Sequence, residues 1–330
     1  MGVSPVLIFV IILILWAEFV NGSTDACNSI ATVVSTRVLS PKKAVVMASI
    51  LNILGALSGT AVAETIGKGI IKPEIINLQT VGVAMVGIIF WSTLAWKYGL
   101  PTSESHALIS GLAGAGLALR GFKVLLFEGW LKVFIGLFFS TFLGFGLSYI
   151  IFLIIAWIFQ NKKISYIRKT FGRLQIFSAA FMAFSHGSND GQKFMGAFSL
   201  ALLLGGITKE FVVPVWVIFL CAFIMGIGTI IGGWRIIKTL GMKLTKLEPQ
   251  DGFAAETAAA SAIEIASRLG IPLSTTHTIT TAIMGVGAVK KRAGVRWLVA
   301  KEIVAAWILT FPVCGLIAWT ITKLSLIWLK

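Results

Sequence analysis

Long apolar runs recur along the whole chain, and they constrain its fold more than any other feature. Each run is about as long as the 17–25 helical residues that cross a bilayer core. They are Val3–Val20, Ala44–Ala63, Thr80–Trp96, Val133–Phe159, Phe211–Trp234 and Ile303–Thr322. Continuous runs form helices, whereas the strands of a membrane barrel show alternating segments of about ten residues. We therefore expect an all-α, multi-pass protein of the cell membrane, with the lipid bilayer as its surroundings.

The composition agrees with this class. Of the 330 residues, 57% are hydrophobic and only 12% are charged, whereas soluble domains carry about 25% charged residues. Shorter apolar runs lie around 107–119, 174–185, 194–208 and 278–289. We expect about ten to twelve membrane segments, some crossing only partway. The first run lacks a basic n-region and a small-residue cleavage site, so we expect a retained helix rather than a signal peptide.

The net charge is 28 − 13 = +15. In a membrane protein such a balance indicates basic loops on the cytoplasmic side rather than a nucleic-acid partner. The clearest basic segment is "NKKISYIRKTFGR" (Asn161–Arg173), which we expect in the cytoplasm. The odd number of cysteines gives no sign of a disulfide framework; they are Cys27, Cys221 and Cys314.

The chain repeats two polar segments in the same order. "VNGSTDACNSIAT" (Val20–Thr32) matches "SHGSNDGQKFMGA" (Ser185–Ala197) at an offset of 185 − 20 = 165. "GLPTSESHALISGLAGAG" (Gly99–Gly116) matches "GIPLSTTHTITTAIMGVG" (Gly270–Gly287) at an offset of 270 − 99 = 171. One match would be weak, but two colinear matches indicate an internal duplication.

The duplication predicts two halves, 1–158 and 174–330, joined by a basic cytoplasmic linker at 159–173. The paired motif regions are 18–41 and 98–121 in the first half, and 183–202 and 252–292 in the second. Duplicated halves with discontinuous helices or hairpins at matching positions are typical of secondary transporters. Such proteins bind substrate near the bilayer midplane. We expect the two repeats to have inverted topology.

The Pro-Ser-His motifs, "PTSESH" (Pro101–His106) and "PLSTTH" (Pro272–His277), predict helix N-termini inside the membrane. Proline fits the stop of one helix or the first turn of the next, and Ser and Thr cap helix starts. Free N–H groups and the helix dipole then form an anion site without a cation. Two such N-termini could hold one tetrahedral oxyanion. The alternative is that each motif caps a helix into water at the membrane surface.

The Gly-Ser-Asp motifs carry two carboxylates, Asp25 and Asp190, with Asn28 and Asn189 nearby. A carboxylate within a membrane is expensive and indicates function. Carboxylate, amide and carbonyl oxygens suit a hard cation, and we expect the glycines to loosen the helix and free carbonyls. The alternative is that the aspartates only cap helices at the interface. Glu256, in "GFAAETAAA", is a further candidate.

An anion and two aspartates would repel one another in a low dielectric unless cations were bound with them. Such cooperative binding is the basis of symport. Because neither Pro-Ser-His motif holds a lysine or arginine, we expect the counter-charge to come from outside the chain. All three histidines lie in the motifs, as His106, His186 and His277. We favour packing or capping roles for them over a metal site.

Taken together, these motifs resemble those of the inorganic phosphate transporter (PiT) family over essentially the whole chain. The resemblance implies cation-coupled uptake of inorganic phosphate, inverted repeats and a homodimer. It implies phosphate contacts from Thr24, Asp25, Ser103, Ser105, His106, Ser274, Thr275 and Thr276. It implies cation contacts from Asp25, Asn28, Asn189, Asp190 and Glu256. The chain departs from the family pattern at Lys193, which breaks the symmetry with Asn28, and at Thr24, where Asn or His is usual.

We therefore predict a secondary transporter that imports phosphate with a cation, Na⁺ before H⁺, by alternating access. No cofactor is expected, and no metal beyond Na⁺. Alternatives are metal–phosphate symport, a sulfate permease of the same fold, an ion channel, or an intramembrane hydrolase. The hydrolase is poorly supported because Ser105 and His106 are adjacent and do not face each other on a helix. We predict that the protein is not an enzyme.

Overall fold

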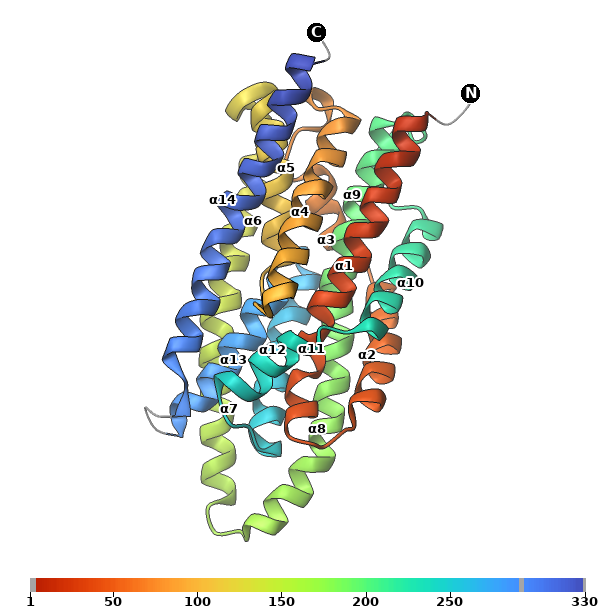
Figure 1. Ribbon diagram of the computed structural model, residues 1–330. Helices are drawn as coiled ribbons and strands as arrows, with labels where there is room; N and C mark the ends of the chain where they lie inside the picture. Colours follow the sequence, from red (N-terminus) through yellow and green to blue (C-terminus); the bar gives the residue numbers. More distant parts are fainter. Residues whose placement is uncertain (1–3, 291–293, 329–330) are drawn as a thin grey trace.

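The computed structural model describes residues 4–290 and 294–328. These residues form a bundle of helices with no β-strand among them (Figure 1). α1 (Pro5–Ser35) begins and α14 (Trp297–Trp328) ends at the upper end of the view. Residues 291–292, the end of the last predicted motif region, lie outside the described residues. The expected all-α, multi-pass architecture is confirmed.

The two predicted halves contribute similar series of helices. After α1, the first half forms α2 (Pro41–Ala56), α3 (Ala61–Lys68), α4 (Leu78–Tyr98), α5 (Glu104–Arg120), α6 (Phe127–Phe138), the π-helical η3 (Phe139–Leu143) and α7 (Gly144–Phe159). The second half forms α8 (Ile164–His186), the π-helical η4 (Gly187–Gly191), α9 (Gln192–Leu204), α10 (Val215–Ile231), α11 (Trp234–Lys238), the π-helical η5 (Thr239–Leu244), α12 (Pro249–Arg268), α13 (Thr275–Val289) and α14. The 3₁₀ turns are η1 (Pro73–Ile75) and η2 (Gly121–Val124).

Five stretches of the described residues are long and apolar enough to cross a membrane. They are Pro5–Ser35, Leu78–Tyr98, Glu104–Val124, Phe127–Phe159 and Trp297–Ile327. Two further spans arise if bent pairs are joined: α2 with α3, bent by 69°, and α10 with α11 and η5, bent by 61°. The bent pairs occupy matching places in the two predicted halves, outside the motif regions where discontinuous helices were expected. The other α-helices are shorter or more polar.

The first helix of each bent pair packs against a helix of the other half: α10 packs against α1, and α2 packs against α8. Glycine permits both contacts: a Cβ on Gly22 would lie 2.4 Å from the Met225 carbonyl oxygen, and one on Gly187 would lie 2.1 Å from that of Asn52. The neighbouring contacts are related in the same way, Gly228 with Phe19 O and Gly55 with Phe184 O. In these contacts Gly22 corresponds to Gly187 at an offset of 187 − 22 = 165. Their partners on α2 and α10, Asn52 and Met225, correspond at an offset of 225 − 52 = 173. α2 and α10 thus form a third correspondence between the predicted halves, one that has no counterpart among the matched sequence motifs.

Two apolar clusters fill the bundle, and a polar layer separates them. One cluster lies around α4, α5 and α9, and the other around α12, α13 and α8. α1 passes through both, with Ala17 in the first cluster and Cys27 in the second. Its buried polar side chains at this level are Glu18, Asn21, Thr24, Asp25 and Asn28. The polar layer is therefore enclosed within the protein at mid-height.

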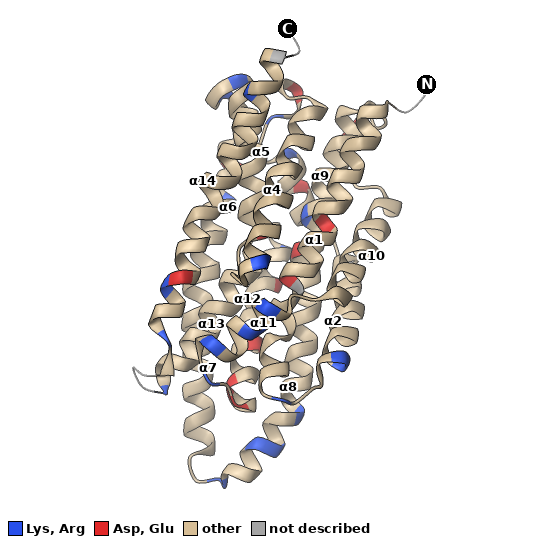
Figure 2. Cartoon of the chain, viewed as in Figure 1, with Lys and Arg blue, Asp and Glu red and all other residues tan. Residues whose placement is uncertain are grey.

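The outer surface is apolar where lipid would meet it. Phe134, Phe142 and Trp157, on α6, η3 and α7, expose 60%, 62% and 72% of their surface. Figure 2 shows lysines and arginines at the lower end of the bundle, including the connection between α7 and α8. Most of the basic segment is helical, because only residues 160–163 separate these helices. The division into halves around this segment, and its cytoplasmic location, stay predictions.

Candidate functional site

The two Pro-Ser-His motifs form the N-termini of α5 and α13. Ser103 and Ser274 are the N-caps, and their hydroxyl oxygens accept from the backbone N–H groups of His106 at 3.3 Å and His277 at 3.2 Å. The Ser105 hydroxyl donates to the carbonyl of Leu273 at 2.9 Å. The two helix starts therefore meet inside the bundle, as the sequence predicted, with α5 in the upper part of Figure 1 and α13 in the lower part.

The hairpins are the helix pairs α4–α5 and α12–α13, each joined at a Pro-Ser-His motif. The first-half carboxylate, Asp25, lies beside the second-half hairpin. Asp25 and Asn28 stand one turn apart on α1, and Thr276 lies opposite both. The Thr276 hydroxyl donates to Asp25 over 3.2–3.3 Å, and the Asn28 amide donates to that hydroxyl at 2.8 Å. Among the described residues, the amide oxygen of Asn28 has no hydrogen-bond partner, although it is buried. A carboxylate and a free amide oxygen are suitable ligands for a hard cation.

The second-half carboxylate, Asp190, lies in η4, and its two oxygens are both engaged. Oδ1 contacts the Lys193 ammonium. Oδ2 accepts from the Thr275 hydroxyl at 3.1 Å and lies 3.4 Å from His186 Nε2. The Lys193 ammonium also donates to Ser105 and, at 3.1 Å, to the Leu273 carbonyl. The expectation that the counter-charge comes only from outside the chain was therefore wrong, because a lysine of the Gly-Ser-Asp motif reaches the hairpins.

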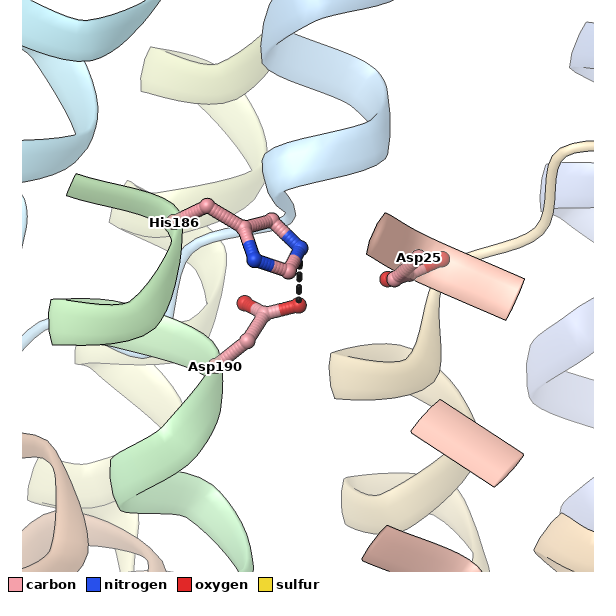
Figure 3. A group of neighbouring side chains, drawn as sticks. All are labelled: Asp25, His186 and Asp190. Carbon is pink, nitrogen blue, oxygen red and sulfur yellow. Dashed lines mark ion pairs between the residues drawn. The ribbon is translucent and has the colours of Figure 1, made fainter. Parts of the chain in front are cut away.

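The two carboxylates face each other across the centre of the bundle. Ligand atoms of Asp25, Asp190 and His186 all lie within 4.8 Å of one another (Figure 3). At this separation two unit charges repel by about 3 kcal/mol, even at an effective dielectric constant of ~20. Lys193 offsets the charge of Asp190, whereas no lysine or arginine of the described residues is paired with Asp25. A cation bound near Asp25 would remove the repulsion.

Two buried acids of this layer, Glu104 and Glu18, were not predicted from the sequence. Glu104, the first residue of α5, accepts from Thr24 at 3.1 Å and from Ser92 at 2.6 Å. Glu18 accepts from Asn21 at 3.0 Å. Glu104 stands inside the quoted motif "PTSESH", so the high cost of a carboxylate within the membrane could have marked it. Thr24, a predicted phosphate contact, is thus bonded to a carboxylate.

Other predicted site residues lie farther from this centre. Glu256 accepts from Thr32, Ser178 and, at 3.1 Å, Gln175, and so forms a separate polar cluster. The Asn189 amide donates to Ser267 at 2.9 Å and to the Ile271 carbonyl at 3.3 Å. Its oxygen has no partner among the described residues.

The hairpin histidines pack against each other rather than against the carboxylates. The rings of His106 and His277 have centroids 4.7 Å apart, and His277 stacks on Trp307 at 3.8 Å. The structure thus brings Asp25, Asn28, Asp190, Ser105, Thr275 and Thr276 together. Ser103 and Ser274 support them as caps. The roles of all these residues stay predictions.

The Gly-Ser-Asp motif is not a helix break in the first half. α1 runs without interruption through Gly22 and Asp25, whereas the second copy forms the π-helical η4. The expectation that glycine loosens the first helix was wrong there. Gly22 instead permits close contact with α10. The three cysteines are buried and free, as expected.

A helical membrane bundle with two helix N-termini and facing carboxylates at its centre has the architecture of a secondary transporter. The chain belongs to the phosphate transporter family, whose model matches residues 21–318. The family settles the class of protein: a transporter of phosphate, not an enzyme, and a multi-pass protein of the cell membrane.

Curated relatives match nearly the whole chain. A probable low-affinity inorganic phosphate transporter of Rhizobium meliloti (strain 1021) is 46% identical over 316 residues, covering 95% of each chain. One of Bacillus subtilis (strain 168) with the same description is 40% identical over 309 residues, covering 93% of each. A solved structure titled "The sodium-dependent phosphate transporter" superposes with a TM-score of 0.89. It covers 98% of this chain and 100% of its own, at 24% identity, and so supports the fold.

Proposed function

We propose that the protein imports inorganic phosphate together with Na⁺, by alternating access to the central site between α1, α5, η4 and α13. One observation carries the proposal. The N-termini of α5 and α13, which suit an anion, open beside two facing carboxylates, which suit a cation. Neither charge would enter this enclosed layer easily without the other.

Phosphate would bind where the hairpins meet. The hydroxyls of Ser105, Thr275 and Thr276 already lie there, bonded to the Leu273 carbonyl, to Asp190 and to Asp25, respectively. Free N–H groups at the two helix starts and the positive ends of the helix dipoles add to the attraction. Hydroxyl groups rotate and can donate to a phosphate oxygen in place of their present acceptors.

Sodium would bind at Asp25, with the free amide oxygen of Asn28 as a second ligand. Neutralising Asp25 weakens its repulsion of phosphate, so that each ion raises the affinity for the other. The sodium-dependent transporter that shares the fold supports Na⁺ as the first choice. In this proposal Glu256, with its three donors, is an accessory cation ligand and not part of the phosphate site.

Alternating access would proceed by movement of one half against the other. The site bonds cross between the halves: Thr276 with Asp25 and Asn28, and Ser105 with Lys193. A relative movement of the halves would therefore exchange these bonds and open the site to one side at a time. The reciprocal contacts of α1 with α10 and of α8 with α2 would be the surfaces along which they move.

The test is uptake of radiolabelled phosphate into proteoliposomes that contain the purified protein. An inward sodium gradient is compared with a pH gradient alone. We expect saturable uptake that follows the sodium gradient, is abolished in Asp25→Asn, and persists in the control Glu64→Gln, an exposed acid on α3. No uptake under any gradient would overturn the proposed function.

The alternatives are separate outcomes of this experiment. Uptake driven by the pH gradient alone, without sodium, would identify a proton as the coupling ion. A requirement for Mg²⁺ that EDTA removes would identify a metal–phosphate complex as the substrate. Uptake that does not saturate would indicate a channel. The homodimer stays a prediction, which the mass of the protein–detergent complex tests.

A further inference from the structure

The central site contains two triads of side chains that correspond in the two halves. In one, Asn28 donates to Thr276, and Thr276 donates to Asp25. In the other, Lys193 donates to Ser105 and to Asp190. The aspartates and their partners three residues on match at 190 − 25 = 193 − 28 = 165, and the hydroxyls match at 276 − 105 = 171. Each triad joins a Gly-Ser-Asp motif of one half to a hairpin of the other.

The two triads differ in charge at one position, where the neutral amide of Asn28 corresponds to the ammonium of Lys193. Lys193 is the only lysine or arginine that is completely buried among the described residues. Its three acceptors are a carboxylate, a hydroxyl and a backbone carbonyl: Asp190, Ser105 and Leu273. Oxygens of these kinds also bind hard cations. The ammonium thus occupies a place that would otherwise suit an ion.

We propose that Lys193 is a built-in counter-ion that replaces a transported cation at the second-half aspartate, so that only the first-half aspartate recruits a cation from solution. The proposal rests on the function proposed above, and it specifies how the charge of the two equivalent sites is balanced. Under this proposal Lys193 sets the number of cations that bind with each phosphate. Its bond to Ser105 also places its ammonium beside the proposed phosphate site.

The first-half site lacks the built-in positive charge that the second-half site has. Asn28 brings no charge to Asp25, and its amide oxygen is left without a partner among the described residues. At the second-half site both carboxylate oxygens already have donors, Lys193 for Oδ1 and Thr275 for Oδ2. A cation from solution would gain a free ligand at the first site, whereas it would have to displace the lysine at the second.

The chain itself supplies the substitution that tests the proposal, because Lys193→Asn places in the second half the residue that the first half already has. The variant removes the fixed charge and leaves oxygen ligands around Asp190. Equilibrium binding of radiolabelled phosphate to the purified full-length protein is measured over a range of Na⁺ concentrations. The slope of log affinity against log Na⁺ concentration counts the sodium ions that bind with phosphate.

We expect the slope for Lys193→Asn to exceed that of the wild type by about one sodium ion. At low sodium the variant should bind phosphate weakly, and at high sodium its affinity should approach the wild-type value. The matched control is Lys193→Met, which removes the charge but adds no oxygen ligand. It should bind phosphate weakly, and sodium should restore its affinity less than that of Lys193→Asn.

Equal slopes for the wild type and Lys193→Asn would overturn the proposal. So would Lys193→Met matching the asparagine variant at every sodium concentration. A folding defect is detected separately by size-exclusion chromatography. If Lys193→Asn fails to fold, direct binding of ²²Na⁺ to the wild type decides: one ion lost in Asp25→Asn supports the proposal, and two equivalent ions overturn it. Wild-type protein that neither binds nor transports phosphate would instead contradict the proposed function.

Discussion

The two central aspartates should differ sharply in what they contribute to stability. Replacing Asp190 with Asn leaves the buried ammonium of Lys193 with uncharged acceptors only: amide, hydroxyl and backbone carbonyl oxygens. Replacing Asp25 with Asn removes a carboxylate that has no cationic partner and that lies within 4.8 Å of Asp190. Both changes relieve the repulsion between the two carboxylates, but only the first also breaks an ion pair. Both should abolish uptake, but only Asp190→Asn should unfold easily.

The magnitude follows from the burial of the pair, in which both side chains are fully inaccessible, at 0% exposure. Removing one partner of a buried ion pair costs about 3–5 kcal/mol, whereas replacing both partners is often nearly neutral. At about 2 °C per kcal/mol, Asp190→Asn should lower the apparent Tm by about 6–10 °C. Asp25→Asn should leave it unchanged or raise it slightly in sodium-free buffer.

The assay is thermal unfolding of the detergent-solubilised protein at a fixed scan rate, followed by tryptophan fluorescence. The double variant Asp190→Asn/Lys193→Met completes the cycle and should recover most of the lost stability, because neither charge is left alone. Added sodium should raise the Tm of the wild type through its binding to the folded state. It should not raise the Tm of Asp25→Asn.

Two results would refute this reasoning. Equal losses of stability in Asp25→Asn and Asp190→Asn would mean that Lys193 does not compensate Asp190 selectively. A double variant that is less stable than Asp190→Asn alone would mean that the lysine is stabilised by groups other than this carboxylate.

Three further predictions address the anion site, its selectivity and the packing of the halves. Ser105→Ala and Thr276→Ala should each weaken phosphate binding by about 1.5–3 kcal/mol, the contribution of a hydrogen bond to a charged group, with a smaller effect on sodium binding. Unchanged phosphate affinity in both would contradict the hairpin site. Arsenate should compete with phosphate uptake and excess sulfate should not, because a carboxylate accepts the proton that phosphate and arsenate keep and sulfate lacks; equal competition would favour a sulfate permease. Gly187→Ala should destabilise the protein by about 1–3 kcal/mol through overpacking against α2. The control Gly146→Ala, whose Cβ would meet nothing within 4 Å, should be tolerated, and similar thermal stability of the two variants would refute the close contact.

The hairpin caps and the central aspartates could be predicted because their signals are local and occur twice. A proline with a serine two residues later favours a helix start. The duplication singled out Ser103 and Ser274 from the many other hydroxyls of the chain. The same duplication identified Asp25 and Asp190. The membrane class followed from the long apolar runs together with the low fraction of charged residues.

The partners of these residues could not be predicted, because they depend on contacts between distant parts of the chain. In the sequence, Lys193 is visible only as a departure from the symmetry with Asn28. The fold shows that its ammonium lies between Asp190 and the hairpin of the other half. The correspondence of α2 with α10 was also hidden, since it rests on backbone contacts at Gly22 and Gly187 rather than on matching side chains. Glu104 was overlooked although its position carried the signal.

The bond between Thr276 and Asp25 has a consequence for the synthesis of the protein. The two residues are 251 positions apart, so at about 5–20 residues per second the ribosome needs roughly 10–50 s to make the interval. During this time α1 is already complete, while Asp25 has no partner from the second half. Glu104 differs, because its donors Thr24 and Ser92 precede it in the chain. Completion of the ion site is therefore a late event of biogenesis, and a chain truncated before α13 would leave an unpaired acid in the membrane, a feature by which quality control could recognise it.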